Sequence, residues 1–339
     1  MLHKDKIMRE LEGAQNLLWY DNHEALAYAR QLWQAHGEHR LIPLSAYHGE
    51  YAAYAVDGSQ VYPDRHQGLQ CALINIGTVQ FLYGAVTSHA YLESYPTILA
   101  LPETGDVQDW VDGKRQELEL AYGIRLLEQA IAQAEKQPLL LFDGSLAFCA
   151  ANTKLSEMKE YFNLRYQQLL YQLFQMDADV AWYVSAPHSK ELMQQLCKAA
   201  QQEKGAYDLS SITDAQLLEH VIPIGMHTTA FASASAMHYP APLRPHFLYG
   251  NNGYEIMRIE IPEWIIGDEQ RVARIIACIA DQIAKGYGYP ISIAEAHEQA
   301  VVTTDDKYFF YAALQSFAQQ HKKTFQISQK LKKKMKLSM

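Results

Sequence analysis

The sequence predicts an α/β fold, in which a sheet of parallel and antiparallel strands is flanked by helices. Two observations carry this prediction. Short apolar runs of strand length alternate with amphipathic stretches of helix length, and a β-rich segment near the front, 69–86, favours antiparallel pairing. The 339 residues are 49% apolar, which is enough to build a sizeable core and excludes a disordered chain.

The first 45 residues predict an N-terminal helical arm. Apolar residues recur at helical spacing over 4–36, among them Leu11, Leu18, Leu26 and Trp33. The stretch 46–321 then forms the body of the protein, with strands and helices in alternation.

The body begins with strand signals. Residues 51–56 form an unbroken apolar run that ends in Asp57-Gly-Ser, as expected for a strand covered on both faces. The segment 69–86 contains Gly77 and Gly84 and predicts two antiparallel strands or one long bent strand.

The remaining elements follow from the same patterns, and two segments stand apart from them. Residues 199–245 show no clear periodicity and are interpreted as an insertion, and 322–339 form a basic tail with seven lysines and no acid. We predict strands at 138–142 and 180–185, a hairpin at 245–262, and helices at 106–136, 154–176, 268–285, 290–302 and 305–321.

Composition narrows the class of protein. The net charge is −9 although the tail is basic, so the tail is expected to have a partner or to be a solvated end. Neither a membrane span nor a signal peptide is expected, and the four cysteines form no CxxC pair. We therefore expect a cytoplasmic protein with buried thiols.

Two aspartates are the first candidates for chemistry. Asp57 and Asp143 each follow an apolar strand and each precede Gly-Ser. The carboxyl ends of strands in an α/β sheet open onto the ligand crevice, so both carboxylates would face one space. Because two neighbouring carboxylates repel, a hard cation such as Mn²⁺ or Mg²⁺ would fit between them. A single Asp-Gly of this kind is commonly only a turn or a helix cap.

Further ligands would come from the helices. Glu117, Glu119 and Glu128 lie on the helix predicted between the two aspartates, and a pair of metal ions needs several carboxylates. His297 lies in a helix of small apolar residues, where it could be a core residue, a metal ligand or a group that handles a proton.

Several segments together resemble the NurA family of DNA-repair nucleases. The segments occur in the family's order and span about residues 46 to 321, and the C-terminal Tyr-Pro…Ala-His block is the specific part. They are AVDGS (55–59), LLLFDGSL (139–146), RPHFLYG (244–250) with IMRIEIPEW (256–264), and GYGYPISIAEAHEQAVV (286–302).

This resemblance implies an RNase H-like fold and an activity. Members of the family are Mn²⁺-dependent single-strand endonucleases and 5′→3′ exonucleases, which work as dimers with the hexameric DNA translocase HerA in double-strand break repair. It further implies that the catalytic and metal-binding set is Asp57, Asp143, His297 and a helix glutamate four residues after Arg115, which is Glu119; Glu117 and Glu128 stay open.

Weaker expectations concern the residues that bind the DNA phosphates and the strength of binding. The resemblance makes Arg65 and Lys190 candidates for phosphate contacts. Because the body is acidic, binding by the isolated protein should be weak and salt-sensitive, and a partner ATPase would compensate.

Two alternatives use the same residues differently. Sugar kinases and actin-like ATPases also place Asp-Gly-Ser/Thr loops after buried strands, although no Gly-Gly adenosine loop stands near this C-terminus. The second alternative is a non-catalytic DNA clamp or adaptor that keeps the fold.

Overall fold

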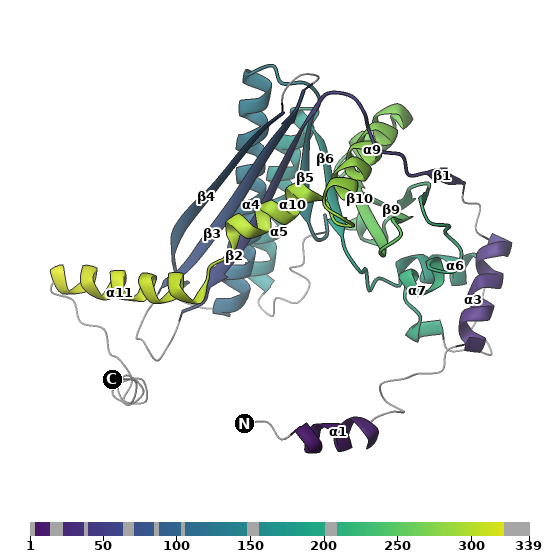
Figure 1. Cartoon of the computed structure of the whole chain (residues 1–339), viewed down its shortest axis with the longest axis horizontal. Helices are drawn as coiled ribbons and strands as arrows, with labels where there is room; N and C mark the ends of the chain where they lie inside the picture. The colour runs from purple at the N-terminus through teal and green to yellow at the C-terminus, as the bar shows by residue number, and fades with distance from the viewer. Residues whose placement is uncertain are drawn as a thin grey trace.

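The structure is a computed structural model that describes residues 4–13, 23–36, 40–63, 71–84, 88–102, 106–147, 156–200 and 209–321. Among these residues the strands form a single ten-stranded mixed sheet (Figure 1). Its order is β1-β7-β9-β10-β6-β5-β2-β3-β4, and β8 pairs with β9. The bounds are β1 Leu41–Pro43, β2 Tyr51–Val61, β3 Cys71–Tyr83, β4 Ser88–Ala100, β5 Pro138–Asp143, β6 Asp179–Val184, β7 Met226–Thr228, β8 Phe231–Ala232, β9 Pro245–Asn251 and β10 Ile256–Pro262.

Only the central strands run parallel. Strand β5 pairs in parallel with both β2 and β6, whereas the other pairings are antiparallel. The apolar runs of β2 and β5, residues 51–56 and 139–142, are buried as predicted, because helices cover both faces of the sheet. The mixed α/β architecture predicted from the sequence is confirmed.

The helices lie on both faces of the sheet. Figure 1 shows α10 crossing one face while α4 and α5 lie behind the sheet. Their bounds, with those of the other described helices, are α1 Lys4–Gly13, α3 His23–His36, α4 Val107–Ala132, α5 Ser156–Gln175, α6 Glu191–Ala199, α7 Asp214–Leu218, α8 Glu263–Ile266, α9 Glu269–Lys285, α10 Ile291–Ala300 and α11 Thr304–Gln320; short 3₁₀ turns lie at Leu209–Ser211 and Ala234–His238.

A glycine sets how closely α10 approaches the sheet. A Cβ atom on Gly77 of β3 would lie 2.3 Å from the carbonyl oxygen of Ala296 and 2.4 Å from the amide nitrogen of Ala300. The backbone of α10 therefore rests directly on β3, a contact that only glycine permits. This contact fixes the helix that carries His297.

The predicted arm and insertion both contact the body. Within the arm, α1 and α3 are described, and α3 buries Ala29 and Trp33 in a second hydrophobic cluster with Leu192 of α6 and Leu217 of α7. The stretch interpreted as an insertion contributes β7 and β8 to the sheet. The domain boundaries stay predictions, and the basic tail 322–339 lies outside the described residues.

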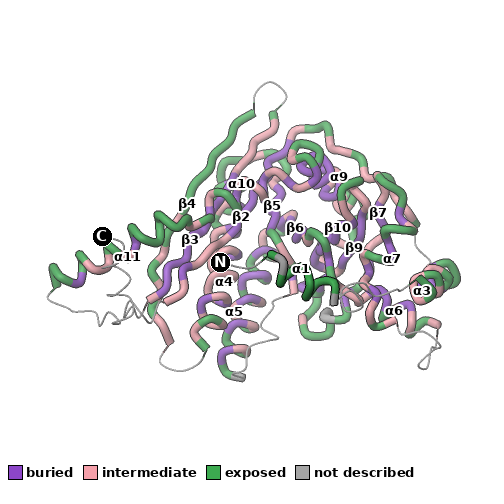
Figure 2. The backbone as a smooth tube through the Cα atoms, turned by 60° about the horizontal axis from the view of Figure 1, so that its bottom comes forward, coloured by how far each residue is buried: buried purple, intermediate pink, exposed green. Residues whose placement is uncertain are grey.

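One sequence prediction is wrong, one is right in one of its two alternatives, and one strand was missed. Strand β2 does not end before Asp57 but continues to Val61, because its pairing with β3 extends to that residue. Of the two alternatives for 69–86, the described residues form a single long strand, β3, and its partner β4 was not predicted. Strand β4 is an edge strand with an exposed outer half (Figure 2), and its Pro96 and exposed apolar residues blur the alternation that marks a strand.

The thiol prediction is also only partly right. Cys278 is buried, but Cys71 and Cys197 are partly exposed, because each lies at an end of an element rather than in its middle. Cys149 lies outside the described residues.

Candidate active site

The two aspartates predicted to meet do lie on neighbouring strands. The parallel pairing of β2 with β5 places Val56 opposite Phe142, and Asp57 and Asp143 are the next residue on each strand. Neighbouring strands are about 4.8 Å apart, so the two backbones are close at this point. Both side chains line the same pocket, whose volume is about 320 Å³.

Asp57 is held by helix α10, which lies on the face of the sheet opposite to α4. It is 9% exposed, and its Oδ2 lies 2.7 Å from Nδ1 of His297 in α10. Its Oδ1 accepts a hydrogen bond of 2.8 Å from the backbone amide of Gly58. His297 itself is 60% exposed, so one side of its ring faces solvent while the other orients the aspartate.

Glu119 enters the pocket from α4 and is paired with Arg115 one helical turn earlier. Burial raises the pKa of Glu119 to about 7; the guanidinium of Arg115 opposes this shift, and the charges of Asp57 and Asp143 add to it. A Cβ on Gly58 would lie 2.6 Å from Oε1 of Glu119. Gly58 therefore provides space for the glutamate, and strand β2 continues through it without a turn.

Asp143 ends β5 and is paired with a tyrosine. The hydroxyl of Tyr289 donates a hydrogen bond of 2.8 Å to its Oδ1. Burial raises the pKa of Asp143; the bond from Tyr289 lowers it, and the charge of Asp57 raises it again. Gly144 follows with φ +88°, so the chain turns directly after Asp143.

The three carboxylates are chemically suited to bind a hard cation, although each of them contacts another side chain in this structure. Asp57 contacts His297, Glu119 contacts Arg115 and Asp143 contacts Tyr289, and within the described ranges no group of three His, Cys, Asp or Glu is arranged as a ready metal site. Burial is the main cause of the raised pKa of Glu119 and of Asp143, and the charge of Asp57 adds to both; a hard cation with oxygen ligands would relieve this repulsion.

The other candidate acids lie elsewhere on α4. Glu117 forms ion pairs with Lys114 at 2.6 Å and Arg165 at 2.8 Å, and does not line the pocket. Glu128 is exposed. Of the three helix glutamates, the structure therefore brings only Glu119 to the two aspartates.

Of the two candidate phosphate contacts, only Lys190 is described, and it does not line the pocket of the carboxylates. Lys190 precedes α6, donates to the carbonyl oxygen of Ser210 and lines a second pocket of about 450 Å³. The walls of the two pockets share Ser145 and Ala147. Arg65 lies outside the described residues.

Sequence reasoning did not assign two features of the site. Tyr289 was noticed only as part of the Tyr-Pro block, and its bond to Asp143 depends on a contact 146 residues apart. Arg258 and Glu260 lie on the fully buried strand β10 and form an ion pair of 2.6 Å. A charge at every second position of an otherwise apolar strand was the available signal for this pair.

The residues of this site lie in a stretch that is similar to known proteins. A family model described as the NurA domain matches residues 51–302. The chain belongs to the NurA family. This is a family of nucleases, and the matched stretch includes Asp57, Glu119, Asp143 and His297.

The chain is also similar to solved structures, and the first of these supports the fold. One described as "Crystal structure of NurA" is 12% identical with a TM-score of 0.51, over 93% of this chain and 98% of the other. A second, "Crystal structure of NurA bound to dAMP and manganese", is 13% identical with a TM-score of 0.48, over 89% and 94% of the two chains. No curated protein matched the sequence. None of the described helices is long and apolar enough to cross a membrane.

Proposed function

We propose that this member of the NurA family is a metal-dependent deoxyribonuclease that hydrolyses DNA phosphodiester bonds, as a single-strand endonuclease and a 5′→3′ exonuclease. The observation that supports this best is the convergence of Asp57, Glu119 and Asp143 on one pocket. Two of them come from adjacent parallel strands and the third from the helix that covers those strands. Acidic side chains are the usual ligands of Mn²⁺ and Mg²⁺ in phosphodiester hydrolysis.

Each residue has a role that its contacts support. Asp57, Glu119 and Asp143 would hold Mn²⁺ or Mg²⁺, and His297 would orient Asp57 or complete the ligand set. The bound metal supplies activation of water and stabilisation of the leaving oxygen. Glu119 must give up the proton that burial favours, and the adjacent guanidinium of Arg115 assists that loss.

His297 has a second possible use in the reaction. Its ring faces solvent on one side and contacts Asp57 on the other, so it could pass a proton to or from a group in the pocket. Tyr289 holds Asp143 from the opposite direction. Both aspartates are thereby restrained by residues of the C-terminal block.

The proposed substrate and partners come from the family resemblance, and charge adds one argument for them. We infer that single-stranded DNA or DNA ends are delivered by a HerA-type hexameric ATPase to a homodimer in the cytoplasm. The acidic composition opposes phosphate binding, and delivery by a partner would compensate for that. Lys190, and outside the described residues Arg65, are the proposed phosphate contacts. DNA end processing in double-strand break repair is the proposed setting.

The test is cleavage of an end-labelled single-stranded oligonucleotide with Mn²⁺ or with EDTA. We expect Asp57→Asn, Asp143→Asn and Glu119→Gln each to abolish cleavage while the melting temperature stays close to that of the wild type. Glu128→Gln is the matched control, because it changes an exposed acid on the same helix, and it should cleave normally. Normal cleavage by Asp57→Asn and Asp143→Asn would refute the assignment.

Two binding measurements beside the cleavage assay separate the alternatives. Binding of the oligonucleotide without cleavage under any metal would favour the clamp or adaptor. Stoichiometric ATP binding by the isolated protein would favour the kinase or ATPase reading, which membership of a nuclease family argues against.

A further inference from the structure

The segment that follows Asp143 is held by a buried carboxylate from a distant strand. Ser145 Oγ and the backbone amide of Leu146 both donate to Oε2 of Glu260, at 2.8 and 2.7 Å. Glu260 belongs to β10 and is only 2% exposed. Because one carboxylate oxygen accepts two bonds from consecutive residues, it fixes the path of the chain immediately after Asp143.

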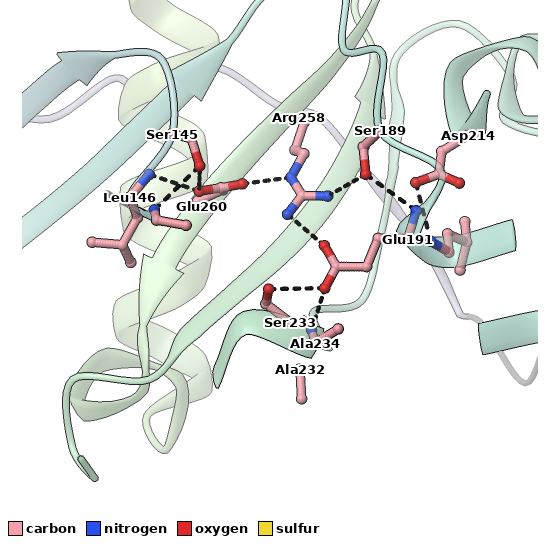
Figure 3. A network of polar contacts seen from close by, with 12 residues as sticks. Ser145, Leu146, Ser189, Glu191, Asp214, Ala232, Ser233, Ala234, Arg258 and Glu260 are labelled. Atoms are coloured by element: carbon pink, nitrogen blue, oxygen red, sulfur yellow. Dashed lines mark hydrogen bonds and ion pairs between the residues drawn. The ribbon is translucent and has the colours of Figure 1, made fainter. Parts of the chain in front are cut away.

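The carboxylate is itself oriented by an arginine. Nε of Arg258 lies 2.6 Å from the other oxygen of Glu260, and its guanidinium also contacts Oε2 of Glu191 at 2.9 Å and rests 3.9 Å from the ring centroid of Phe247. Glu191 is tied in turn to Ser233. Figure 3 shows this chain of contacts running from the Ser145 segment through Glu260 and Arg258 to Glu191.

Stability alone does not explain why the charged residues Arg258 and Glu260 occupy buried positions. Removing a buried ion pair from water costs free energy that its mutual attraction commonly only offsets, and apolar residues of similar volume are often as stable. An apolar replacement could not accept the hydrogen bonds that the hydroxyl of Ser145 and the amide of Leu146 donate. The useful property of Glu260 is therefore the position that it imposes on this segment.

Position matters at this point because Gly144 has few restraints of its own. Gly144 adopts φ +88°, and no atom outside its chain neighbours lies within 4 Å of where a Cβ would stand. Its amide donates a hydrogen bond of 2.9 Å to the carbonyl oxygen of Tyr183, and two residues later Leu146 is fully buried in the main core. The two bonds to Glu260 come from Ser145 and Leu146 and set the path of the chain between these anchors.

We propose that Glu260, oriented by Arg258, is a positioning residue that fixes the turn after Asp143 and so places the Asp143 carboxylate for metal binding. The inference rests on the proposed role of Asp143 as a metal ligand. Glu260 is not proposed as a ligand, because it does not line the pocket of the three carboxylates, and its oxygens are bonded to Arg258, Ser145 and Leu146.

The experiment compares Glu260→Gln with the wild-type full-length protein by three measurements. Amide hydrogen exchange on the metal-free protein should be at least about tenfold faster over residues 144–147 in the variant, because the acceptor of the Leu146 amide is perturbed. The dissociation constant for Mn²⁺, from the electron paramagnetic resonance signal of free Mn²⁺, should rise about tenfold. In cleavage assays kcat should fall while KM for the oligonucleotide stays within about twofold.

A matched control separates positioning from loss of stability. Asp179→Asn also breaks ion pairs on the same sheet, with Arg271 and Arg274, and these are partly buried. Asp179 begins β6, at the end of that strand opposite to Tyr183, the residue that pairs with Asp143. It should lower the melting temperature and leave exchange over 144–147 and the Mn²⁺ dissociation constant unchanged. If both variants weaken Mn²⁺ binding equally, Glu260 is merely structural and the proposal is overturned.

A second variant covers the case in which Glu260→Gln does not fold. Ser145→Ala removes one of the two loop bonds without disturbing the ion pair, and should shift exchange and Mn²⁺ binding in the same direction by less. No shift in either would also overturn the proposal. Failure of the proposed function looks different: the wild type itself would then neither bind Mn²⁺ in the pocket nor cleave DNA, whatever the exchange rates.

Discussion

The tripeptide Asp-Gly-Ser occurs twice in this protein, and the two copies have different structures. Residues 57–59 stay in the extended strand β2, whereas 143–145 leave β5 in a turn with Gly144 at φ +88°. A Cβ on Gly58 would collide with Glu119, yet a Cβ on Gly144 would meet no atom within 4 Å. The first glycine is needed for space and the second for its backbone conformation.

The partners of the two aspartates differ as well. Asp57 contacts His297, which reaches the strand because α10 rests on Gly77. Asp143 contacts Tyr289, and the residues after it are held by Glu260. The same local sequence therefore obtains its geometry from what packs against it, so the two copies should respond differently to the same kind of change.

The largest difference in kcat is expected between variants of His297 and Tyr289, the residues that contact the two aspartates. We predict that His297→Ala lowers kcat about 100-fold, because a histidine that handles a proton contributes at least that much. Tyr289→Phe should cost less than about tenfold, since it removes one hydrogen bond worth about 1 kcal/mol. Single-turnover cleavage with saturating Mn²⁺ measures both. Equal losses would mean that the histidine acts only by orienting its aspartate.

The next effect concerns the crowded glycine. Gly58→Ala should destabilise the protein by about 1–3 kcal/mol and displace Glu119, because the added methyl group overpacks the contact with α4. Denaturant unfolding and Mn²⁺ titration would show both losses. A fully stable and fully active Gly58→Ala would contradict the close approach of Glu119 to β2.

The pH dependence sharpens the role of Glu119. Burial raises its pKa to about 7, so below that pH a metal must displace a proton, and Mn²⁺ affinity should weaken by about tenfold per pH unit. The same shift makes the carboxyl favour the folded metal-free protein at low pH, a stabilisation that is lost as the pH rises through about 7. Mn²⁺ titrations and melting curves from pH 5 to 8 test this, with Glu119→Gln as the variant that should lose its share of both trends.

The smallest effect is expected at the open glycine. Gly144→Ala meets no steric obstacle but forces alanine into the left-handed region, which costs about 1 kcal/mol. Denaturant unfolding should show that loss, and cleavage should change much less than in Gly58→Ala. A greater loss of cleavage in Gly144→Ala than in Gly58→Ala would reverse the comparison.

The sequence could predict the adjacency of Asp57 and Asp143, because apolar runs mark buried strands and buried strands end at a common edge. It could not predict that β2 continues past Asp57, since that depends on eleven residues of pairing with β3. The contacts of Tyr289 and Glu260 join residues more than 100 positions apart, and local patterns carry no information about such contacts. The pattern of residues left three helix glutamates open, and the family resemblance selected Glu119 among them.

Anomalous scattering from crystals of the Mn²⁺-bound protein tests the central claim most directly. The account predicts a manganese peak in the pocket, within bonding distance of both the Asp57 and Asp143 carboxylates, with Glu119 turned away from Arg115 toward the ion. A protein that cleaves DNA with Mn²⁺ but shows the metal elsewhere, while both aspartates keep only their contacts to His297 and Tyr289, would contradict it.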